Sequence, residues 1–276
     1  MDIYDNEYTI LEKIKISIKE TSNFIKTNCF VKQVNNMDIY ISYIFCKLLK
    51  LCKNIRYIYC KNQNKKTINK DGKYIITLDP LVQKDVILNN GITGTIFSII
   101  DIEKNLIIIA GYAIYGPSTQ VVIATNEGVD VYQMIDNLFT KIITGYKIPL
   151  KGHTYCLDLS KKYLIDQRWR IIIDISIKNK YKHLWSGSLL NDFNRVLLNG
   201  GFITCPNTKN EEDLYTIIHT VKPLVFIFKK AGGYEWGDNG LIEDESEKIV
   251  EINSKTPFFF GSKYEYDIYL KNFYNL

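Results

Sequence analysis

The sequence predicts a layered α/β protein of the α+β kind, and three observations support this prediction. Segments with apolar residues at helical spacing alternate with short apolar runs of strand length along all 276 residues. Hydrophobic residues make up 46% and charged residues 24%, which is typical of a globular protein with a sizeable core. No repeat and no low-complexity linker interrupts the alternation, so helices and sheets are expected to stack in layers.

The first half of the chain, residues 1–150, is predicted to begin with two helices, because isoleucines recur there at helical spacing among lysines and glutamates. These helices are expected over residues 9–26 and 37–51. Apolar runs then predict strands over residues 57–60, 74–78 and 95–100, a hairpin-like pair of strands around Gly116-Pro117 within residues 109–124, and a sixth strand over residues 129–134. Asp79-Pro80 is expected to end the second of these strands, because proline cannot donate a ladder hydrogen bond.

The second half, residues 151–276, opens with the segment KGHTYCLDL and is expected to pack on the first half without a flexible hinge. Helices are predicted over residues 188–198, 214–230 and 264–273, with a short strand over residues 202–205. A glycine pair follows each of the first two helices, Gly200-Gly201 and Gly232-Gly233, as is common at helix ends.

Charge and cysteine usage narrow the classes of function. The net charge is +5, but the lysines are scattered and no basic block is present, so we expect no nucleic-acid partner. The six cysteines, Cys29 among them, form no CxxC pair and mostly lie in apolar runs, which indicates free thiols in a reducing compartment. No signal peptide or membrane span is visible, so the predicted location is the cytoplasm.

The stretch IAGYAIYGPSTQVVIA at residues 109–124 resembles the core of the fructose-1,6-bisphosphatase family. Five further segments agree with that family in order and spacing: YIITLDPL, GTIF, KGHTYCLDL, SGSLLNDFNRVLLNGG and KAGG. The resemblance is to class I members and extends to sedoheptulose-1,7-bisphosphatase. It implies an α/β/α/β/α sandwich, usually a tetramer, that removes the 1-phosphate of a sugar bisphosphate with Mg²⁺. We also expect Asp79 and the Gly116 turn to face a common cleft.

The resemblance implies a metal site whose carboxylates are mostly replaced in this chain. The family's Glu-Glu pair falls on Lys61 and Asn62, its second loop aspartate on Val82, the glycine after that aspartate on Gln83, and its late glutamate on Thr220. Since Mg²⁺ is held mainly by carboxylate oxygens, these exchanges predict a degenerate site. Asp79 and the Leu81 carbonyl remain as remnants, although an aspartate before proline also commonly makes a local turn hydrogen bond. Lys61 could equally lie in solvent.

Other functional positions that the resemblance implies are also altered. Asp38 matches a helix aspartate that helps to polarise the water nucleophile, with an ordinary exposed carboxylate as the alternative. The substrate side of the family falls on Asp158 and on Gly187, Ser188 and Leu189, where the alternative is a simple helix cap. Leu184 stands where family members carry an arginine that enters a neighbouring subunit's site.

An AMP site is implied only in part. Glu7, Thr9, Lys73 and Tyr74 match positions that bind this inhibitor in regulated members, while Asp101 stands in place of an expected arginine. The alternative is that Lys73 and Tyr74 merely end a strand.

The prediction is a noncatalytic, fructose-1,6-bisphosphatase-like protein of carbohydrate metabolism. It would need no cofactor and act as a regulatory or interaction subunit, either as a homo-oligomer or with an active relative. One alternative is an active Mg²⁺-dependent bisphosphatase that recruits Asp38, Asp85 and Glu103 beside Asp79. Another is a metal-free binder of a phosphorylated ligand such as a sugar phosphate, with Lys61 and Lys84 supplying the positive charge.

Overall fold

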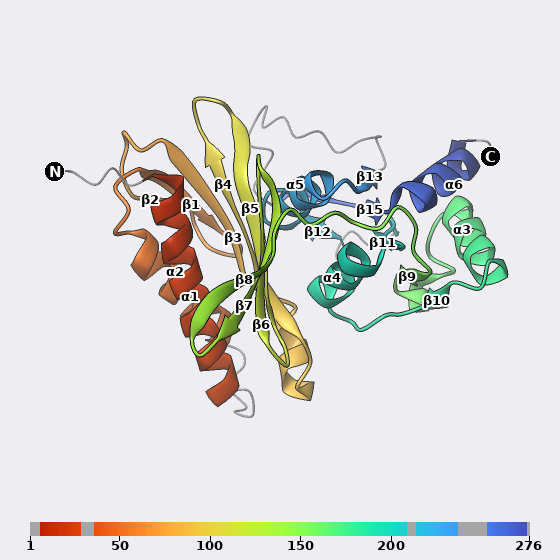
Figure 1. Ribbon diagram of the computed structural model, residues 1–276, viewed down its shortest axis with the longest axis horizontal. Coiled ribbons are helices and arrows are strands. Elements are labelled where there is room, and N and C mark those ends of the chain that lie inside the picture. The colour runs from red at the N-terminus through yellow and green to blue at the C-terminus, as the bar shows by residue number, and fades with distance from the viewer. Residues whose placement is uncertain (1–5, 29–35, 209–213, 237–252, 275–276) are drawn as a thin grey trace.

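The computed structural model describes residues 6–28, 36–208, 214–236 and 253–274, and it stacks five layers in the order α/β/α/β/α (Figure 1). Helices α1 and α2 form the first layer, and an eight-stranded sheet forms the second. Helices α4 and α5 lie between this sheet and a five-stranded sheet, whose far side is covered by α3 and α6. The predicted layered α/β class is therefore confirmed.

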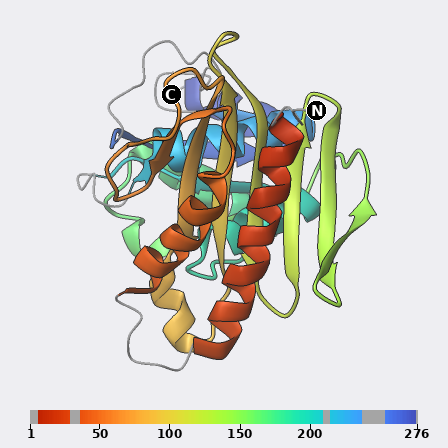
Figure 2. The ribbon, with the colours of Figure 1, turned by 90° about the vertical axis from the view of Figure 1, so that its left-hand side faces the viewer.

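The first layer consists of α1 (Glu7–Asn28) and α2 (Met37–Leu49), which lie side by side across the large sheet (Figure 2). Both helices were predicted, with ends shifted by two residues. Five of their isoleucines are buried in a first hydrophobic core, which also contains Phe45, Phe97 and Ile99: Ile10, Ile14, Ile18, Ile25 and Ile41. The apolar spacing of the sequence thus marks the face that packs on the strands.

The large sheet has the strand order β2-β1-β3-β4-β5-β6-β7-β8 and is antiparallel except for the parallel pair of β1 and β3. Its strands are β1 (Ile55–Cys60), β2 (Lys66–Thr67), β3 (Tyr74–Val82), β4 (Thr93–Asp101), β5 (Leu106–Tyr115), β6 (Thr119–Thr125), β7 (Gly128–Ile135) and β8 (Leu138–Ile143). All six strands predicted for the first half are present, and β2 and β8 are additional.

Strand β3 does not end before Pro80, so that prediction was wrong. The strand continues to Val82, with a register shift against β4 between Asp79 and Val82. Two hydroxyls of β4 support the segment that lacks the proline N–H: Thr95 donates to the Pro80 carbonyl at 2.8 Å, and Thr93 donates to the Val82 carbonyl at 2.5 Å. Side-chain donors therefore hold the strand where the backbone ladder is interrupted.

The small sheet has the order β10-β9-β11-β15-β13 and comes entirely from the second half. Its strands are β9 (Thr154–Cys156), β10 (Lys182–His183), β11 (Phe202–Cys205), β13 (Tyr234–Trp236) and β15 (Phe258–Gly261). Of these strands, only β11 was predicted from the sequence. A separate two-stranded sheet pairs β12 (Tyr215–Thr216) with β14 (Lys255–Thr256).

The helices of the second half are α3 (Gln167–Lys178), α4 (Leu189–Asn199), α5 (Lys222–Lys230) and α6 (Lys263–Tyr274). Helix α3 was not predicted, although Asp166 caps it and its buried residues have helical spacing. The predicted helix over residues 214–230 proved too long, because β12 and a π-helical turn, η5 (Ile217–Val221), precede α5. Prediction of α4 was confirmed, with Ser188 as its cap and Gly200 at its end.

Three hydrophobic cores fill the spaces between the five layers. The second core joins the large sheet to α4, α5 and the small sheet, and Tyr112 meets Phe193 there edge to face with ring centroids 5.6 Å apart. The third core packs α3 and α6 on the small sheet around Trp169, Phe202 and Tyr269. Cys46, Cys52, Cys60 and Cys156 are buried, as expected for thiols in apolar runs, whereas Cys29 lies outside the described residues.

Candidate functional site

A cavity of about 230 Å³ lies where β1, β3 and the start of α2 meet. Three carboxylates, Asp38, Asp79 and Asp85, line it together with Lys61 and Lys84. The parallel pairing of β1 and β3 explains this convergence, since Lys61 directly follows β1 and its N–H donates to Leu78, the residue before Asp79, at 2.9 Å. The sequence positions predicted as remnants of a metal site are therefore brought together, but with lysines among them.

The Asp79 carboxylate is held by groups of the chain itself. Lys61 Nζ lies 2.6 Å from Asp79 Oδ2, and the Thr220 hydroxyl donates to the same oxygen at 3.3 Å. The Asp79 side chain is 2% exposed and that of Lys61 is 26% exposed, so this is a largely buried ion pair. The alternative that Lys61 simply lies in solvent was therefore wrong.

A second ion pair lies at the mouth of the cavity. Lys84 Nζ approaches Asp38 Oδ2 at 3.2 Å, and both side chains are about one-third exposed. The other Asp38 oxygen accepts the N–H of Ile39 in the first turn of α2 at 3.1 Å. Each remaining family carboxylate is thus paired with a lysine.

The residues present do not fit a magnesium ion. Mg²⁺ requires several oxygen ligands in octahedral geometry, but Asp79 Oδ2 already contacts an ammonium group. Val82 packs in the second hydrophobic core and is not among the residues that line the cavity. Within the described ranges, no three His, Cys, Asp or Glu side chains gather as metal ligands. Leu81 and Asp85 also line the cavity, but they do not complete such a set.

His219 is a buried polar group close to this ion pair. It lies in the π-helical turn η5, is 1% exposed, and neither ring nitrogen has a hydrogen-bond partner among the described residues. Burial lowers the pKa of His219 to about 4; the Asp79 carboxylate opposes this shift, and the Lys61 ammonium adds to it. The imidazole is therefore neutral near pH 7, and it adds no positive charge beside Lys61.

The Gln83 side chain lines the cavity and connects the two halves of the chain. Its carbonyl oxygen accepts the N–H of Leu189 at the start of α4, and its amide nitrogen donates to the Tyr215 hydroxyl at 3.1 Å. Gln83 has a φ of 52°, a left-handed conformation that glycine adopts at less cost, so these contacts hold it in an unfavourable geometry. The carboxamide thereby occupies the main-chain N–H of Leu189, one of the positions that the resemblance implies for substrate.

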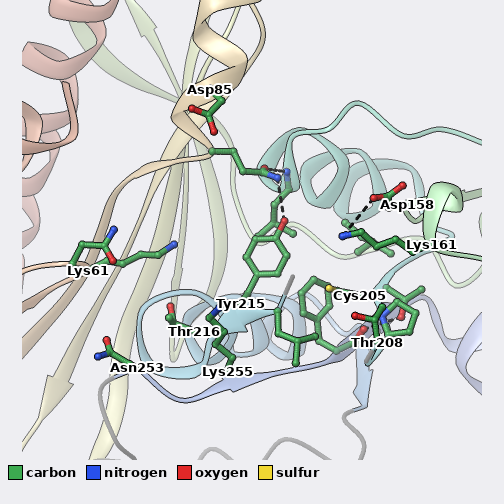
Figure 3. A pocket seen from close by; sticks show the side chains of 18 of the residues that line it. Lys61, Asp85, Asp158, Lys161, Cys205, Thr208, Tyr215, Thr216, Asn253 and Lys255 are labelled. Atoms are coloured by element: carbon green, nitrogen blue, oxygen red, sulfur yellow. Dashed lines mark hydrogen bonds and ion pairs between the residues drawn. The ribbon is translucent and has the colours of Figure 1, made fainter. Parts of the chain in front are cut away.

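A larger cavity of about 1450 Å³ extends from Lys61 into the second half. Figure 3 shows Tyr215 in its middle, Lys61 on one side and the Asp158–Lys161 pair on the other. Lys161 Nζ lies 3.6 Å from Asp158 Oδ2, and Asp158 also caps a short 3₁₀ turn by accepting the N–H of Ser160. The predicted substrate residue Asp158 therefore lines this cavity, but its carboxylate already contacts Lys161 and the Ser160 N–H.

The remaining predicted substrate positions have structural roles. Ser188 caps α4 by accepting the N–H of Asn191, so the helix-cap alternative is correct for this residue. Gly187 supplies a left-handed φ of 73° before the helix, and the Leu189 side chain is buried in the second core. Leu184, in place of the family's arginine, is partly exposed next to Trp185.

Two further expectations are corrected by the positions of the residues. Glu103 follows β4 at the Tyr74 end of the sheet and lines neither cavity, so it cannot serve as a replacement carboxylate. Gly116 also lines neither of them. Asp85, by contrast, lines both cavities, as the active alternative requires.

The positions implied for AMP form an acidic cluster. The Tyr74 hydroxyl donates to Glu7 at 2.7 Å, and Asp101 and Glu103 also act on it electrostatically. Burial, and then Glu7, raise the pKa of Tyr74 above its usual value. The Thr9 N–H and hydroxyl both donate to Asn6 at the start of α1. Three carboxylates facing this position disfavour a phosphate group.

The sequence analysis did not predict that Gln83 and Tyr215 form a hydrogen bond between the two halves of the chain. The contact between them joins residues 132 positions apart, and that between Gln83 and Leu189 spans 106 positions. One signal was available, because glutamine at a position where the family has glycine requires compensating contacts.

Comparisons with known proteins agree with this architecture. Residues 16–144 match the family model of the fructose-1-6-bisphosphatase N-terminal domain, and residues 148–273 match that of the C-terminal domain. The chain is similar to a fructose-1,6-bisphosphatase class 1 of Sulfurihydrogenibium, with 31% identity over 71% of this chain and 64% of that protein. It is 30% identical to the Campylobacter jejuni subsp. doylei protein of the same name, over 85% of this chain and 84% of that protein.

Solved structures show the same fold. The holo form of Leishmania major fructose-1,6-bisphosphatase superposes with a TM-score of 0.88 at 23% identity, covering 95% of this chain and 92% of that one. Its T-state gives the same TM-score over 98% of this chain and 94% of that one. The five-layer fold, the two family models and the identities together show that the chain belongs to the fructose-1,6-bisphosphatase family.

Proposed function

We propose that this chain is a noncatalytic member of the fructose-1,6-bisphosphatase family that works without a metal cofactor as a regulatory or interaction subunit in carbohydrate metabolism. The observation that carries the proposal is the 2.6 Å contact between the Lys61 ammonium and Asp79. This contact neutralises the carboxylate on which a catalytic metal would depend.

Electrostatics explain why this contact opposes metal binding. Two like unit charges about 4 Å apart repel by roughly 4 kcal/mol at an effective dielectric of 20, and a divalent ion doubles this before solvent screening. Each 1.4 kcal/mol corresponds to about a tenfold change in affinity. Lys61 therefore weakens a magnesium site by several orders of magnitude, even when the partial exposure of its side chain is considered.

The experiment measures phosphate release from fructose-1,6-bisphosphate and from sedoheptulose-1,7-bisphosphate with and without Mg²⁺. We expect release at the buffer rate from the natural chain, and little change after Lys61→Glu alone. Activity should return only when Asn62→Glu, Val82→Asp, Thr220→Glu and Gln83→Gly are added, because the ligands of one metal site act as a unit. Chelator-sensitive turnover by the natural chain, lost in Asp79→Ala, would disprove the proposal.

An active Mg²⁺-dependent bisphosphatase is the second candidate. It is favoured by the presence of Asp38, Asp79 and Asp85 around one cavity and by the names of the relatives. It requires both lysine–carboxylate pairs to open when the ion and substrate arrive. Calorimetric titration with Mg²⁺ separates the candidates, since only this one predicts saturable binding that Asp79→Asn removes.

A metal-free binder of a phosphorylated ligand such as a sugar phosphate is the third candidate. It is supported by the large cavity, whose lining includes five lysines: Lys61, Lys65, Lys66, Lys161 and Lys255. Titration with fructose-1,6-bisphosphate in the presence of chelator tests it. Saturable binding that weakens with salt, without phosphate release, would support this candidate and keep the noncatalytic role.

We further propose an oligomer, either of this chain alone or with an active relative, located in the cytoplasm without nucleic-acid or membrane partners. Exposed Tyr40 and Tyr43 on α2 and exposed Leu138 on β8 provide apolar surface for such contacts. Across the described part of the chain, no helix is long and apolar enough to span a bilayer. Sedimentation at tens of micromolar, roughly where a moderate interface holds, should show more than a monomer.

A further inference from the structure

A lysine and a cysteine meet where the β1–β2 hairpin packs on α2. Lys66 Nζ, on β2, lies 3.2 Å from the Cys46 sulfur and 2.8 Å from the Gln63 side-chain oxygen, to which it donates. Cys46 belongs to α2 and is 3% exposed, while Lys66 is part of the wall of the large cavity. The Gln63 contact holds the Lys66 nitrogen beside the thiol.

The second thiol in this region is in a different environment. The Cys60 sulfur contacts the Ser42 hydroxyl at 3.5 Å, and burial raises the pKa of the Cys60 thiol to about 12. Cys60 therefore stays protonated and unreactive, since the thiolate is the reactive form of cysteine. Cys46, by contrast, is in direct contact with an amine-bearing side chain, that of Lys66.

We propose that Cys46 and Lys66 are an oxidative modification site at which molecular oxygen links the two side chains through an S–O–N bridge. The thiol, the ammonium group and one O₂ give the bridge, one water molecule and one proton. The O–O, S–H and two N–H bonds break, and the S–O and O–N bonds form. Sulfur and nitrogen each lose two electrons, and the two oxygen atoms accept the four.

The fold gives this bridge a defined effect. It ties the edge strand β2 to α2 and converts the Lys66 ammonium into an uncharged nitrogen on the cavity wall, a few residues from Lys61. Oxidation would therefore lower the positive charge of the cavity without changing the Lys61–Asp79 pair. The bridge would be reversible, because reductants cleave bonds between sulfur and an electronegative atom.

The test compares the purified full chain kept in air-saturated buffer with the chain kept anaerobically with dithiothreitol. Peptide mass spectrometry should find Cys46 and Lys66 in one linked species that has gained one oxygen and lost two hydrogens, in the aerobic sample only. Dithiothreitol should restore the separate peptides. Air exposure that yields no linked species would overturn the proposal.

Variants identify the atoms of the link. Lys66→Arg keeps the positive charge but removes the reacting amine, so the linked species should be lost, as it should in Cys46→Ser. Lys65→Arg, at the neighbouring position on the same hairpin, is the matched control and should leave the yield unchanged. A species that loses only two hydrogens, survives Lys66→Arg and disappears in Cys60→Ser would be a disulfide and would also overturn the proposal.

Discussion

The two ends of the cleft are both filled by the chain itself, but with groups of different charge. At the Asp79 end, the Lys61 ammonium contacts a carboxylate at 2.6 Å. At the α4 end, the neutral Gln83 carboxamide accepts the Leu189 N–H and donates to Tyr215. The carboxylate at one end is therefore paired with a lysine of the chain. The helix N–H at the other end is hydrogen-bonded to a side-chain carbonyl of the chain.

This difference in charge predicts which of the two contacts contributes more to the stability of the folded chain. A buried charge that loses its counterion is far more costly than a neutral amide that loses one hydrogen bond. Lys61 is therefore required for the stability of the chain as long as Asp79 is present, whereas Gln83 can be exchanged at moderate cost. The following predictions test this ranking, beginning with the largest expected effect.

Lys61→Met should cost about 4 kcal/mol of unfolding free energy, because it leaves the Asp79 carboxylate buried without its counterion. Urea unfolding at pH 7 measures the loss. The double variant Lys61→Met with Asp79→Leu should recover much of it, since an apolar pair has no uncompensated charge. If the single and double variants were equally unstable, the loss would come from packing and not from charge.

Acid should destabilise the protein through His219. Its pKa is about 4 in the folded chain and 6.5 in the unfolded chain, so the unfolded chain binds the extra proton between these values. This contribution to stability is complete above pH 6.5 and falls by about 3 kcal/mol as the pH drops to 4. Unfolding free energies measured across this range should show the slope.

His219→Phe is the control for the acid effect. It removes the titrating group and two ring nitrogens that lack partners among the described residues, so the variant should be as stable as the natural chain at pH 7. The stability difference between the two proteins should then change in favour of the variant below pH 6. Parallel pH profiles would contradict the assignment of the slope to His219.

Gln83→Ala should cost about 1–3 kcal/mol, because the Leu189 N–H and the Tyr215 hydroxyl lose their partner. Relief of the left-handed conformation at this residue is small for alanine, so it should not offset the loss. Thermal unfolding compares this variant with Gln167→Ala at the exposed start of α3, which should change stability little. If both substitutions had equal effects, the hydrogen bonds of Gln83 would not contribute to the stability of the chain.

Lys84→Met should have the smallest effect, below about 1 kcal/mol, because the Asp38–Lys84 pair is about one-third exposed and is screened by water. The same urea assay applies, and added salt should reduce the small difference further. A loss as large as that of Lys61→Met would show that burial does not distinguish the two ion pairs.

Much of the fold could be predicted from local patterns. The helices α1, α2 and α4 and the long strands of the large sheet follow from apolar spacing and from glycine after a helix. The failures occurred where tertiary contacts decide the local structure. Hydroxyls of Thr93 and Thr95 carry β3 past Pro80, and pairing with β14 makes residues 215–216 a strand.

The loss of metal-binding carboxylates from the candidate site could be predicted from the sequence, but the new contacts within the site could not. The exchange of carboxylates for Lys61, Asn62, Val82 and Thr220 is visible in the sequence. The 2.6 Å contact of Lys61 with Asp79 was not, because nothing in the sequence distinguishes a lysine in solvent from a lysine in an ion pair. The parallel pairing of β1 with β3 determines that Lys61 forms an ion pair, because Cys60 pairs with Leu78 and Lys61 therefore lies beside Asp79.

The second hydrophobic core has a consequence for synthesis of the chain on the ribosome. When residue 150 has been made, all eight strands of the large sheet exist, but α4 and α5, which cover Ile96, Tyr112 and Val122, do not. The nascent chain therefore carries an apolar sheet face until about eighty more residues emerge, a delay of several seconds at ordinary elongation rates. During that interval the first half depends on the ribosome surface or on chaperones to keep this face from self-association.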